Sequence, residues 1–396
     1  MFQVLRTPLK NSKPETKERN NMKIPIPELG MLAVPREFRH LFTEEFELTV
    51  RCAEQSRPSE ILNALAQGQI VVLVGKFEYL DGIMRFVHRH DSILALNQAE
   101  LTDLNRYQRS RAREEQKRNN IARLMVAVKG DNLIGVVGCP DCDGLIDWLN
   151  VTEFDPYREP FLMPLRRFFR ILTDMRRQHE GIFMPAIGDS ITVLPHVYVP
   201  YDQSVVDLLA EHLIIDGAAV QVLDMGTGTG ILGMIAAKRG AAKVILTDIS
   251  PNAVENARLN VQRLGLQQTT EVRGPADLFD SVKGEVFDII IFNPPWILGE
   301  PKTLYDEAIY DKEQQIITRF LSQVNDYLSP RGRLLLIYSD ISQSTGEGSL
   351  DKLNELIKQN RLEVVSQWQK TRRSHVLGGR ERVYLFEIHR SMISDK

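Results

Sequence analysis

The chain has 396 residues, which exceeds one ordinary domain and indicates about two domains. Hydrophobic residues make up 43% and charged residues 26% of the sequence, as in a soluble globular protein. The net charge of −3 gives no overall attraction to nucleic acid or membranes, no apolar run is long enough to span a bilayer, and three cysteines are too few for a disulfide framework. The first residues also lack the apolar stretch of a signal peptide, so we expect a cytoplasmic protein.

The N-terminal half predicts a flexible tail over residues 1–22 and a mixed, mainly helical domain over residues 23–181. Apolar residues recur at three- and four-residue steps between Pro35 and Gln67, where Pro58 separates two predicted helices. The β-branched run Ile70–Val74 predicts a strand. No catalytic motif occurs in this half.

Two basic segments of this half invite comparison with nucleic-acid-binding helices. Residues 100–126 contain seven Arg and Lys residues against Glu100, Asp103, Glu114 and Glu115, and residues 159–178 form an amphipathic helix with a second basic face. Aromatic side chains that could stack on single-stranded bases are sparse in the first segment. We therefore interpret it as a solvated helix with ion pairs such as Glu114 with Arg118.

A single C-x-x-C motif, Cys139-Pro-Asp-Cys142, has the spacing of a zinc knuckle. A tetrahedral zinc site needs two further ligands, and the sequence has no second C-x-x-C or H-x-x-x-H. The strand-then-helix setting of thioredoxin-like sites is also missing. The motif is therefore interpreted as a Pro-Asp turn.

A glycine-rich turn opens the second half of the chain. Val222 to Gly230 reads V-L-D-M-G-T-G-T-G, and a helical pattern begins at Ile231. A strand, a tight turn and a helix N-terminus predict a nucleotide-like cofactor site in an α/β sheet. The third glycine falls one residue too early for the dinucleotide pattern, and Ile231-Leu232 stands where a phosphate-binding loop needs Lys followed by Ser or Thr.

D-x-G-x-G-x-G after a strand resembles motif I of the class I S-adenosylmethionine-dependent methyltransferases, which implies S-adenosyl-L-methionine as cofactor. The glycines let the backbone approach its methionine part closely, and Asp224 is suited to its ammonium group, directly or through water. Asp248 follows the predicted strand Lys243–Thr247, where an acid can bind both ribose hydroxyls. The resemblance places Asp277 against the adenine amino group and Leu278 near the adenine face. The predicted cofactor-binding residues are Asp224, Gly226, Thr227, Gly228, Gly230, Asp248, Ile249, Asp277, Leu278 and Asn293, and no metal is expected.

A second motif, Asn293-Pro294-Pro295-Trp296, follows the nearly continuous apolar strand Phe287–Phe292. Two prolines restrain the backbone so that the Asn293 side chain and the Pro294 carbonyl can each accept a hydrogen bond from a planar –NH₂ group, with the Trp296 ring as a stacking face. Two acceptors can draw such a nitrogen toward tetrahedral geometry and expose its lone pair for attack on the sulfonium methyl group. Positioning and electrostatics would supply most of the catalysis. The predicted catalytic residues are Asn293, Pro294 and Trp296.

Strands and helices alternate through the rest of the chain and end in a strand pair. This order resembles the seven-stranded, mostly parallel, Rossmann-like methyltransferase sheet, with helices on both faces. We therefore predict an α/β fold and a methyltransferase catalytic domain over residues 182–396, preceded by a domain that selects the substrate.

The N-P-P-[Y/F/W] motif resembles that of methyltransferases acting on glutamine amides and on exocyclic amines of adenine or guanine. The lead-in at Gly181–Pro200 resembles that of the protein-glutamine methyltransferases, with Pro200 matching and Tyr201–Ser204 departing from the family pattern. The substrate is therefore expected to be a protein or a nucleic acid that carries a planar –NH₂ group. The first hypothesis is a protein glutamine, the second is a nucleobase amine in RNA or DNA, and small-molecule or peptide tailoring stays open.

Overall fold

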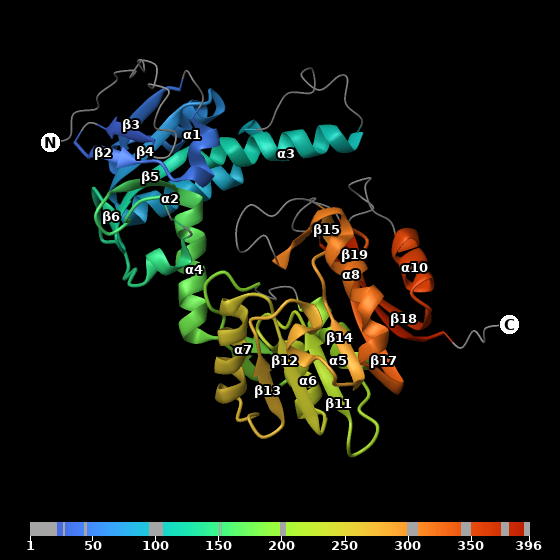
Figure 1. Cartoon of the computed structure of the whole chain (residues 1–396). Helices are drawn as coiled ribbons and strands as arrows, with labels where there is room; N and C mark the ends of the chain where they lie inside the picture. The colour runs from blue at the N-terminus through green and yellow to red at the C-terminus, as the bar shows by residue number, and fades with distance from the viewer. Residues whose placement is uncertain are drawn as a thin grey trace. The chain divides into compact units, whose positions relative to one another are not determined.

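The computed structural model describes residues 22–26, 28–42, 46–94, 106–149, 151, 153–198, 203–298, 308–341, 350–373 and 380–391. The predicted tail, residues 1–22, lies outside these ranges except for Met22. The chain divides into two compact units, residues 1–176 and 177–396 (Figure 1). In the part that is described, no helix is long and apolar enough to cross a membrane.

The first unit is built on a sheet of eight strands, in the order β1-β2-β8-β5-β4-β3, with β6 beside β5 and β7 beside β4. The strands are β1 (Lys23–Ile26), β2 (Gly30–Ala33), β3 (Leu48–Cys52), β4 (Ile70–Lys76), β5 (Leu124–Lys129), β6 (Asn132–Ile134), β7 (Val136–Val137) and β8 (Phe161–Pro164). The helices are α1 (Pro58–Ala66), α2 (Phe77–Arg89), α3 (Arg106–Ala122) and α4 (Leu165–Glu180), with short 3-10 turns η1 (Arg36–Leu41), η2 (Ala53–Gln55), η3 (Asp91–Leu94) and η5 (Leu145–Trp148).

This sheet has more strands than the sequence predicted for this half, since only the β-branched run Ile70–Val74 indicated a strand there. Between Pro35 and Gln67 the prediction of two helices is wrong: only Pro58–Ala66 is an α-helix, and Leu48–Cys52 is a strand. The β3 strand pairs in parallel with β4 along its whole length. That pairing outweighs the helical spacing of its apolar residues, because strand preference depends on neighbours that a single sequence does not show.

The second unit begins with the hairpin β9 (Ile182–Met184) and β10 (Asp189–Ile191), followed by helix α5 (Ser204–His212). Its main sheet has the order β13-β12-β11-β14-β17-β19-β18. The strands are β11 (Gln221–Met225), β12 (Lys243–Thr247), β13 (Thr270–Arg273), β14 (Phe287–Phe292), β17 (Leu328–Ser339), β18 (Leu362–Arg373) and β19 (Arg380–Arg390). The remaining elements are α6 (Ile231–Lys238), α7 (Pro251–Arg263), η6 (Leu278–Val282), β15 (Ile297–Leu298), β16 (Tyr310–Asp311), η8 (Lys312–Gln314), α8 (Gln315–Gln323), η9 (Val324–Tyr327) and α10 (Leu350–Gln359).

Helices cover both faces of this sheet because its central strands are apolar on both faces. Val222 and Ile289 pack in one core with α5, α6 and α7, whereas Leu223 and Ile290 pack in a second core with α8 and α10. The strands from β13 to β17 are parallel, and β19 is antiparallel to both neighbours. The predicted α/β fold is confirmed. Residues 329–332 lie inside β17, where the register with β14 shifts.

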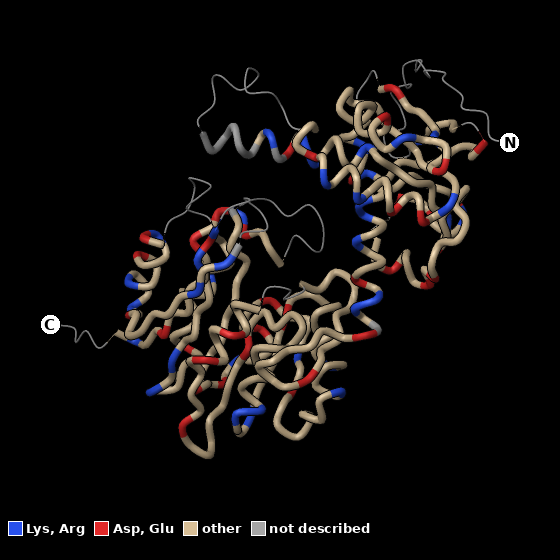
Figure 2. The backbone as a smooth tube through the Cα atoms, turned by 180° about the vertical axis from the view of Figure 1, so that it is seen from behind, with Lys and Arg blue, Asp and Glu red and all other residues tan. Residues whose placement is uncertain are grey.

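Charges are mixed over the second unit. Figure 2 shows its Lys and Arg residues spread over many elements with Asp and Glu residues among them. This distribution agrees with the small net charge of the chain and does not by itself indicate a polyanion partner.

Candidate active site

Three neighbouring strands of the second unit end in register. Met225 of β11 pairs with Thr247 of β12 on one side and with Phe292 of β14 on the other. The glycine loop, Asp248 and Asn293 therefore begin side by side at one edge of the sheet. The chain runs from β11 outward to β12 and β13, then returns to β14 on the opposite side of β11. Such a switch point is where open α/β sheets bind ligands.

The glycine loop has a backbone that side chains would disfavour. Gly226, Gly228 and Gly230 have φ angles of 63°, 55° and 87°, all in the left-handed region. The loop closes on itself through the bond from the Gly230 N–H to the Thr227 carbonyl, 2.8 Å, and the Thr227 N–H donates to the Thr247 carbonyl at 3.0 Å. The end of β12 therefore fixes the loop, and α6 begins directly after it.

Asp224 is completely buried beneath this loop. Its Oδ2 accepts hydrogen bonds from the Thr227 hydroxyl at 2.6 Å and from the Gly233 N–H at 2.9 Å. Its Oδ1 is buried and has no hydrogen-bond partner among the residues that the structure describes. Burial raises the pKa of this carboxyl to about 7, although the two hydrogen bonds act in the opposite direction. A buried acceptor with no partner is the feature expected of a carboxylate that receives a cationic ligand.

Asp248 connects the same loop to the start of α7. Its Oδ2 accepts from the Gly228 N–H and its Oδ1 from the Ser250 N–H, both at 2.9 Å. Burial raises the pKa of Asp248, and the backbone hydrogen bonds lower it. The neighbouring Ile249 is 61% exposed, an unusual exposure for a large aliphatic side chain beside a cofactor loop.

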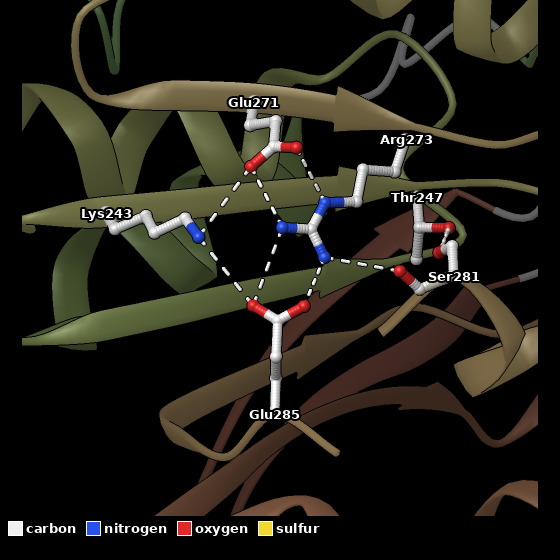
Figure 3. Close-up of polar contacts among 6 residues, drawn as sticks. All are labelled: Lys243, Thr247, Glu271, Arg273, Ser281 and Glu285. Carbon is white, nitrogen blue, oxygen red and sulfur yellow. Dashed lines mark hydrogen bonds and ion pairs between the residues drawn. The ribbon is translucent and has the colours of Figure 1, made fainter. Parts of the chain in front are cut away.

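The segment with Asp277 and Leu278 is attached to the sheet by a polar network. Arg273 of β13 binds the carboxylates of Glu271 and Glu285 and the Ser281 carbonyl, and Lys243 reaches both carboxylates (Figure 3). These hydrogen bonds raise the pKa of the Arg273 guanidinium.

Asp277 and Leu278 each contact helix α8. Asp277 forms an ion pair with Arg319 of α8. Leu278 is buried in the core with α8 and has a φ angle of 43°. Their adenine contacts stay predictions.

The Asn293–Trp296 motif presents two buried polar atoms. The Asn293 Oδ1 acceptor and the Trp296 Nε1 donor are both buried without a hydrogen-bond partner in the described part of the chain. Pro294, which lies between these two residues in the sequence, is also buried. The Arg372 guanidinium carbon lies 5.0 Å from the centre of the Trp296 ring, within the range of a cation–π contact.

Arg372 was not predicted as a site residue. Residues 374–379, shortly after it in the chain, lie outside the described residues. Arg372 belongs to β18 and forms an ion pair with Glu381, its cross-strand partner on β19. Their side chains are only 10% and 3% exposed. Arg372 and Trp296 lie far apart in the sequence, so their contact leaves no local signal.

Two asparagines of α7 were also missed. Asn260 donates to the Thr229 carbonyl in the glycine loop at 2.9 Å and bonds to both backbone groups of Thr192. Asn256 bonds to the Thr192 carbonyl and the Leu194 N–H, both at 2.8 Å. Both side chains are fully buried, so they fasten the segment after β10 to the loop. The signal available in the sequence was a pair of asparagines, four residues apart, beside the apolar residues of a predicted helix.

The geometry defines a ligand site at the ends of parallel strands of an α/β sheet. In the described ranges, no group of three or more His, Cys, Asp or Glu residues could hold a metal ion. The residues that are present fit S-adenosylmethionine instead. The Asp224 oxygen can receive an ammonium group, the Asp248 carboxylate can receive hydroxyls, and the glycines leave room at the loop.

Comparison with known proteins shows which proteins the chain is similar to. The family described as "Methyltransferase small domain" matches residues 201–366. A protein of Methanocaldococcus jannaschii named "Putative protein N5-glutamine methyltransferase" is 32% identical over 180 residues, which span 43% of this chain and 84% of that protein. A release factor glutamine methyltransferase of Bacteroides thetaiotaomicron is 29% identical over 196 residues, 45% of this chain and 67% of the relative. A ribosomal protein L11 methylase of Lactobacillus delbrueckii subsp. bulgaricus aligns with 53% of this chain and 90% of that structure, at 20% identity and a TM-score of 0.37.

The chain belongs to the class I S-adenosylmethionine-dependent methyltransferases. It is a methyltransferase with S-adenosylmethionine as its cofactor. Both relatives align with less than half of this chain.

Proposed function

We propose that this enzyme transfers a methyl group to the side-chain amide nitrogen of a glutamine in a protein. The observation that carries the proposal is the Asn293 Oδ1, an acceptor buried without a partner among the described residues at the end of β14. The names of the two relatives support a glutamine substrate. A primary amide also matches the site chemically, because the two N–H groups of its –NH₂ can donate to Asn293 Oδ1 and to the Pro294 carbonyl.

The role of the chain's residues is to position a weak nucleophile. An amide nitrogen reacts slowly because its lone pair is delocalised over the carbonyl. Hydrogen bonds to Asn293 Oδ1 and to the Pro294 carbonyl hold both N–H groups and direct the lone pair toward the electrophile. When bound, S-adenosylmethionine supplies an electrophilic methyl group. The nitrogen would form one bond to the methyl carbon as the carbon–sulfur bond breaks, with S-adenosylhomocysteine as the leaving group, and would release one proton to solvent.

The remaining site assignments are proposals of the same kind. Asp248 binds the ribose hydroxyls, Ile249 and Leu278 contact the adenine, and Asp277 receives its amino group. Arg372 covers one face of Trp296 and leaves the other face for the substrate amide. We also propose that residues 23–181 select the substrate and that the enzyme acts in the cytoplasm, where its small number of cysteines is ordinary.

A labelling experiment tests the substrate class. The enzyme and its Asn293→Ala variant are incubated with methyl-labelled S-adenosylmethionine and an extract of cells from which the enzyme is removed. The labelled product is divided and treated with protease or with nuclease, and the protein fraction is hydrolysed enzymatically to amino acids. We expect protease-sensitive label that elutes as N5-methylglutamine and is missing with the variant. Nuclease-sensitive label would indicate the nucleobase alternative, and either that or label only in small molecules would contradict the proposal.

A further inference from the structure

The two cysteines of Cys139-Pro-Asp-Cys142 lie in contact in the first unit. They occupy the loop between β7 and η5, and their sulfur atoms are 3.5 Å apart. Cys142 is 5% exposed and packs in the core with Leu145 and Trp148. Cys139 is half-buried, between the exposed residues Gly138 and Pro140. One sulfur thus lies in the core and the other lies at the surface of the same loop.

The hydrogen bonds of the loop give the two thiols different chemistry. The Cys142 S–H lies 3.0 Å from the Pro140 carbonyl and within reach of the Cys139 sulfur. The contact with Cys142 lowers the pKa of the Cys139 thiol, and the same contact together with burial raises the pKa of Cys142. Cys139 is therefore the more reactive thiol, because the thiolate is the nucleophile in disulfide exchange.

The third cysteine has none of these features. The Cys52 thiol donates to Glu54 at 3.2 Å, and burial raises its pKa. No contact with another cysteine is recorded for it in the part of the chain that the structure describes. It therefore serves as an internal control for general thiol oxidation.

We propose that Cys139 and Cys142 form a redox-active dithiol that is oxidised reversibly to a disulfide by exchange with an external disulfide. The Cys139 thiolate attacks one sulfur of the external disulfide and releases the first thiol. Cys142 then loses its proton and attacks Cys139 Sγ, which forms the internal disulfide and releases the second thiol. Two protein thiols are oxidised and one external disulfide is reduced to two thiols.

The loop needs only a small movement for this reaction. A disulfide bond is about 2.04 Å long, so the two sulfurs have to approach by about 1.5 Å. The backbone turns directly after the motif, at residues 143–144, through the Leu145 N–H to the Cys142 carbonyl at 2.8 Å, and the Asp143 N–H donates to Asp141 Oδ1 at 3.0 Å. The turn predicted at Pro140-Asp141 therefore lies a few residues later, and the sulfurs are already close without it.

The test uses the full-length protein in anaerobic glutathione buffers of increasing oxidised fraction. Samples are quenched with acid, alkylated, digested and analysed by mass spectrometry. We expect two of the three thiols to be lost together and a peptide that contains a Cys139–Cys142 disulfide. In Cys52→Ser, the midpoint of this oxidation should be unchanged. We expect Cys142→Ser to retain glutathione on Cys139, and Cys139→Ser to leave Cys142 unmodified. Calorimetric binding of S-adenosylmethionine, whose site lies in the other unit, confirms that each variant is folded.

Three results would overturn the proposal. The first is that all three thiols remain open to alkylation in the most oxidising buffer. The second is glutathione on the buried Cys142 in preference to Cys139, which would reverse the roles of the two thiols. The third is stoichiometric zinc in the purified reduced protein that protects both thiols from oxidation.

Discussion

Replacement of Asp224 by asparagine tests how burial and ligand charge act on one carboxyl. The side chain is fully buried, and its pKa rises from 3.8 to about 7. A rise of about three units corresponds to a cost of about 4 kcal/mol for the ionised form in the folded state. Asparagine can keep the hydrogen bonds from Thr227 and Gly233 without the charge. The variant removes the ionisation cost and the proposed partner of the cofactor ammonium together.

The sign of the effect on stability follows from proton linkage. Between pH 3.8 and about 7 the unfolded chain has lost this proton and the folded protein retains it, so this carboxyl makes the wild type less stable as pH rises. The unfolding free energies of Asp224→Asn and of the wild type are measured with urea and without cofactor. We expect the difference, variant minus wild type, to increase between about pH 4 and about pH 8 by up to about 4 kcal/mol. Asp326→Asn, at an exposed aspartate of η9, is the control for loss of one carboxylate.

Cofactor binding should change in the opposite direction. A cationic group near Asp224 favours the ionised carboxyl, so the affinity of the wild type for S-adenosylmethionine should fall by about tenfold for each pH unit below 7. Asp224→Asn should bind about 10- to 100-fold more weakly at neutral pH and lose this dependence. Parallel stability profiles of variant and wild type, or an unchanged affinity by calorimetry, would refute the reasoning.

Three further variants test the rest of the site. Asn293→Ala should bind the cofactor within a few-fold of wild type and lose about 10²–10³-fold in turnover, and near-normal turnover would exclude the proposed role of its amide oxygen. Asp248→Ala should weaken cofactor binding in calorimetry, since it removes the carboxylate bound to the loop N–H, and equal affinity would remove that assignment. Gly233→Ala should lower the melting temperature by several degrees, because an added Cβ would lie 2.1 Å from Leu246 Cδ2. Gly82→Ala in α2, with nothing within 4 Å of its added Cβ, is the matched control and should be neutral or slightly stabilising.

The catalytic unit could be predicted in outline because its signals are local. The Val222–Gly230 stretch shows a buried strand, a turn that requires positive φ and a helix start within a few residues. Each of the parallel strands β11, β12 and β14 is a short apolar run that ends in a polar or glycine residue. The α/β fold and the cofactor follow from such runs and from the motif.

The first unit and the support of the site could not be predicted in the same way. The apolar residues around β3 have helical spacing, and the pairing with β4 is what makes this segment a strand. The contact of Arg372 with Trp296 depends on the pairing of β18 with β19. Asn260 holds the glycine loop from a helix that follows the next strand, and Asn256 of the same helix bonds to Thr192. Arg372 and Trp296, and likewise Asn260 and the glycine loop, lie far apart in the sequence.

The sequence by itself determined the residue types at the cofactor loop and at the Asn293 motif, since glycine conformation, proline rigidity and carboxylate chemistry belong to the residues themselves. Only the tertiary structure decided that Met225, Thr247 and Phe292 end in register, and that Asp224 is buried with one oxygen that has no partner among the described residues. Register and burial arise when strands far apart in the chain pair and exclude water. The chemistry of the site is therefore local in the sequence, and its geometry is a property of the whole sheet.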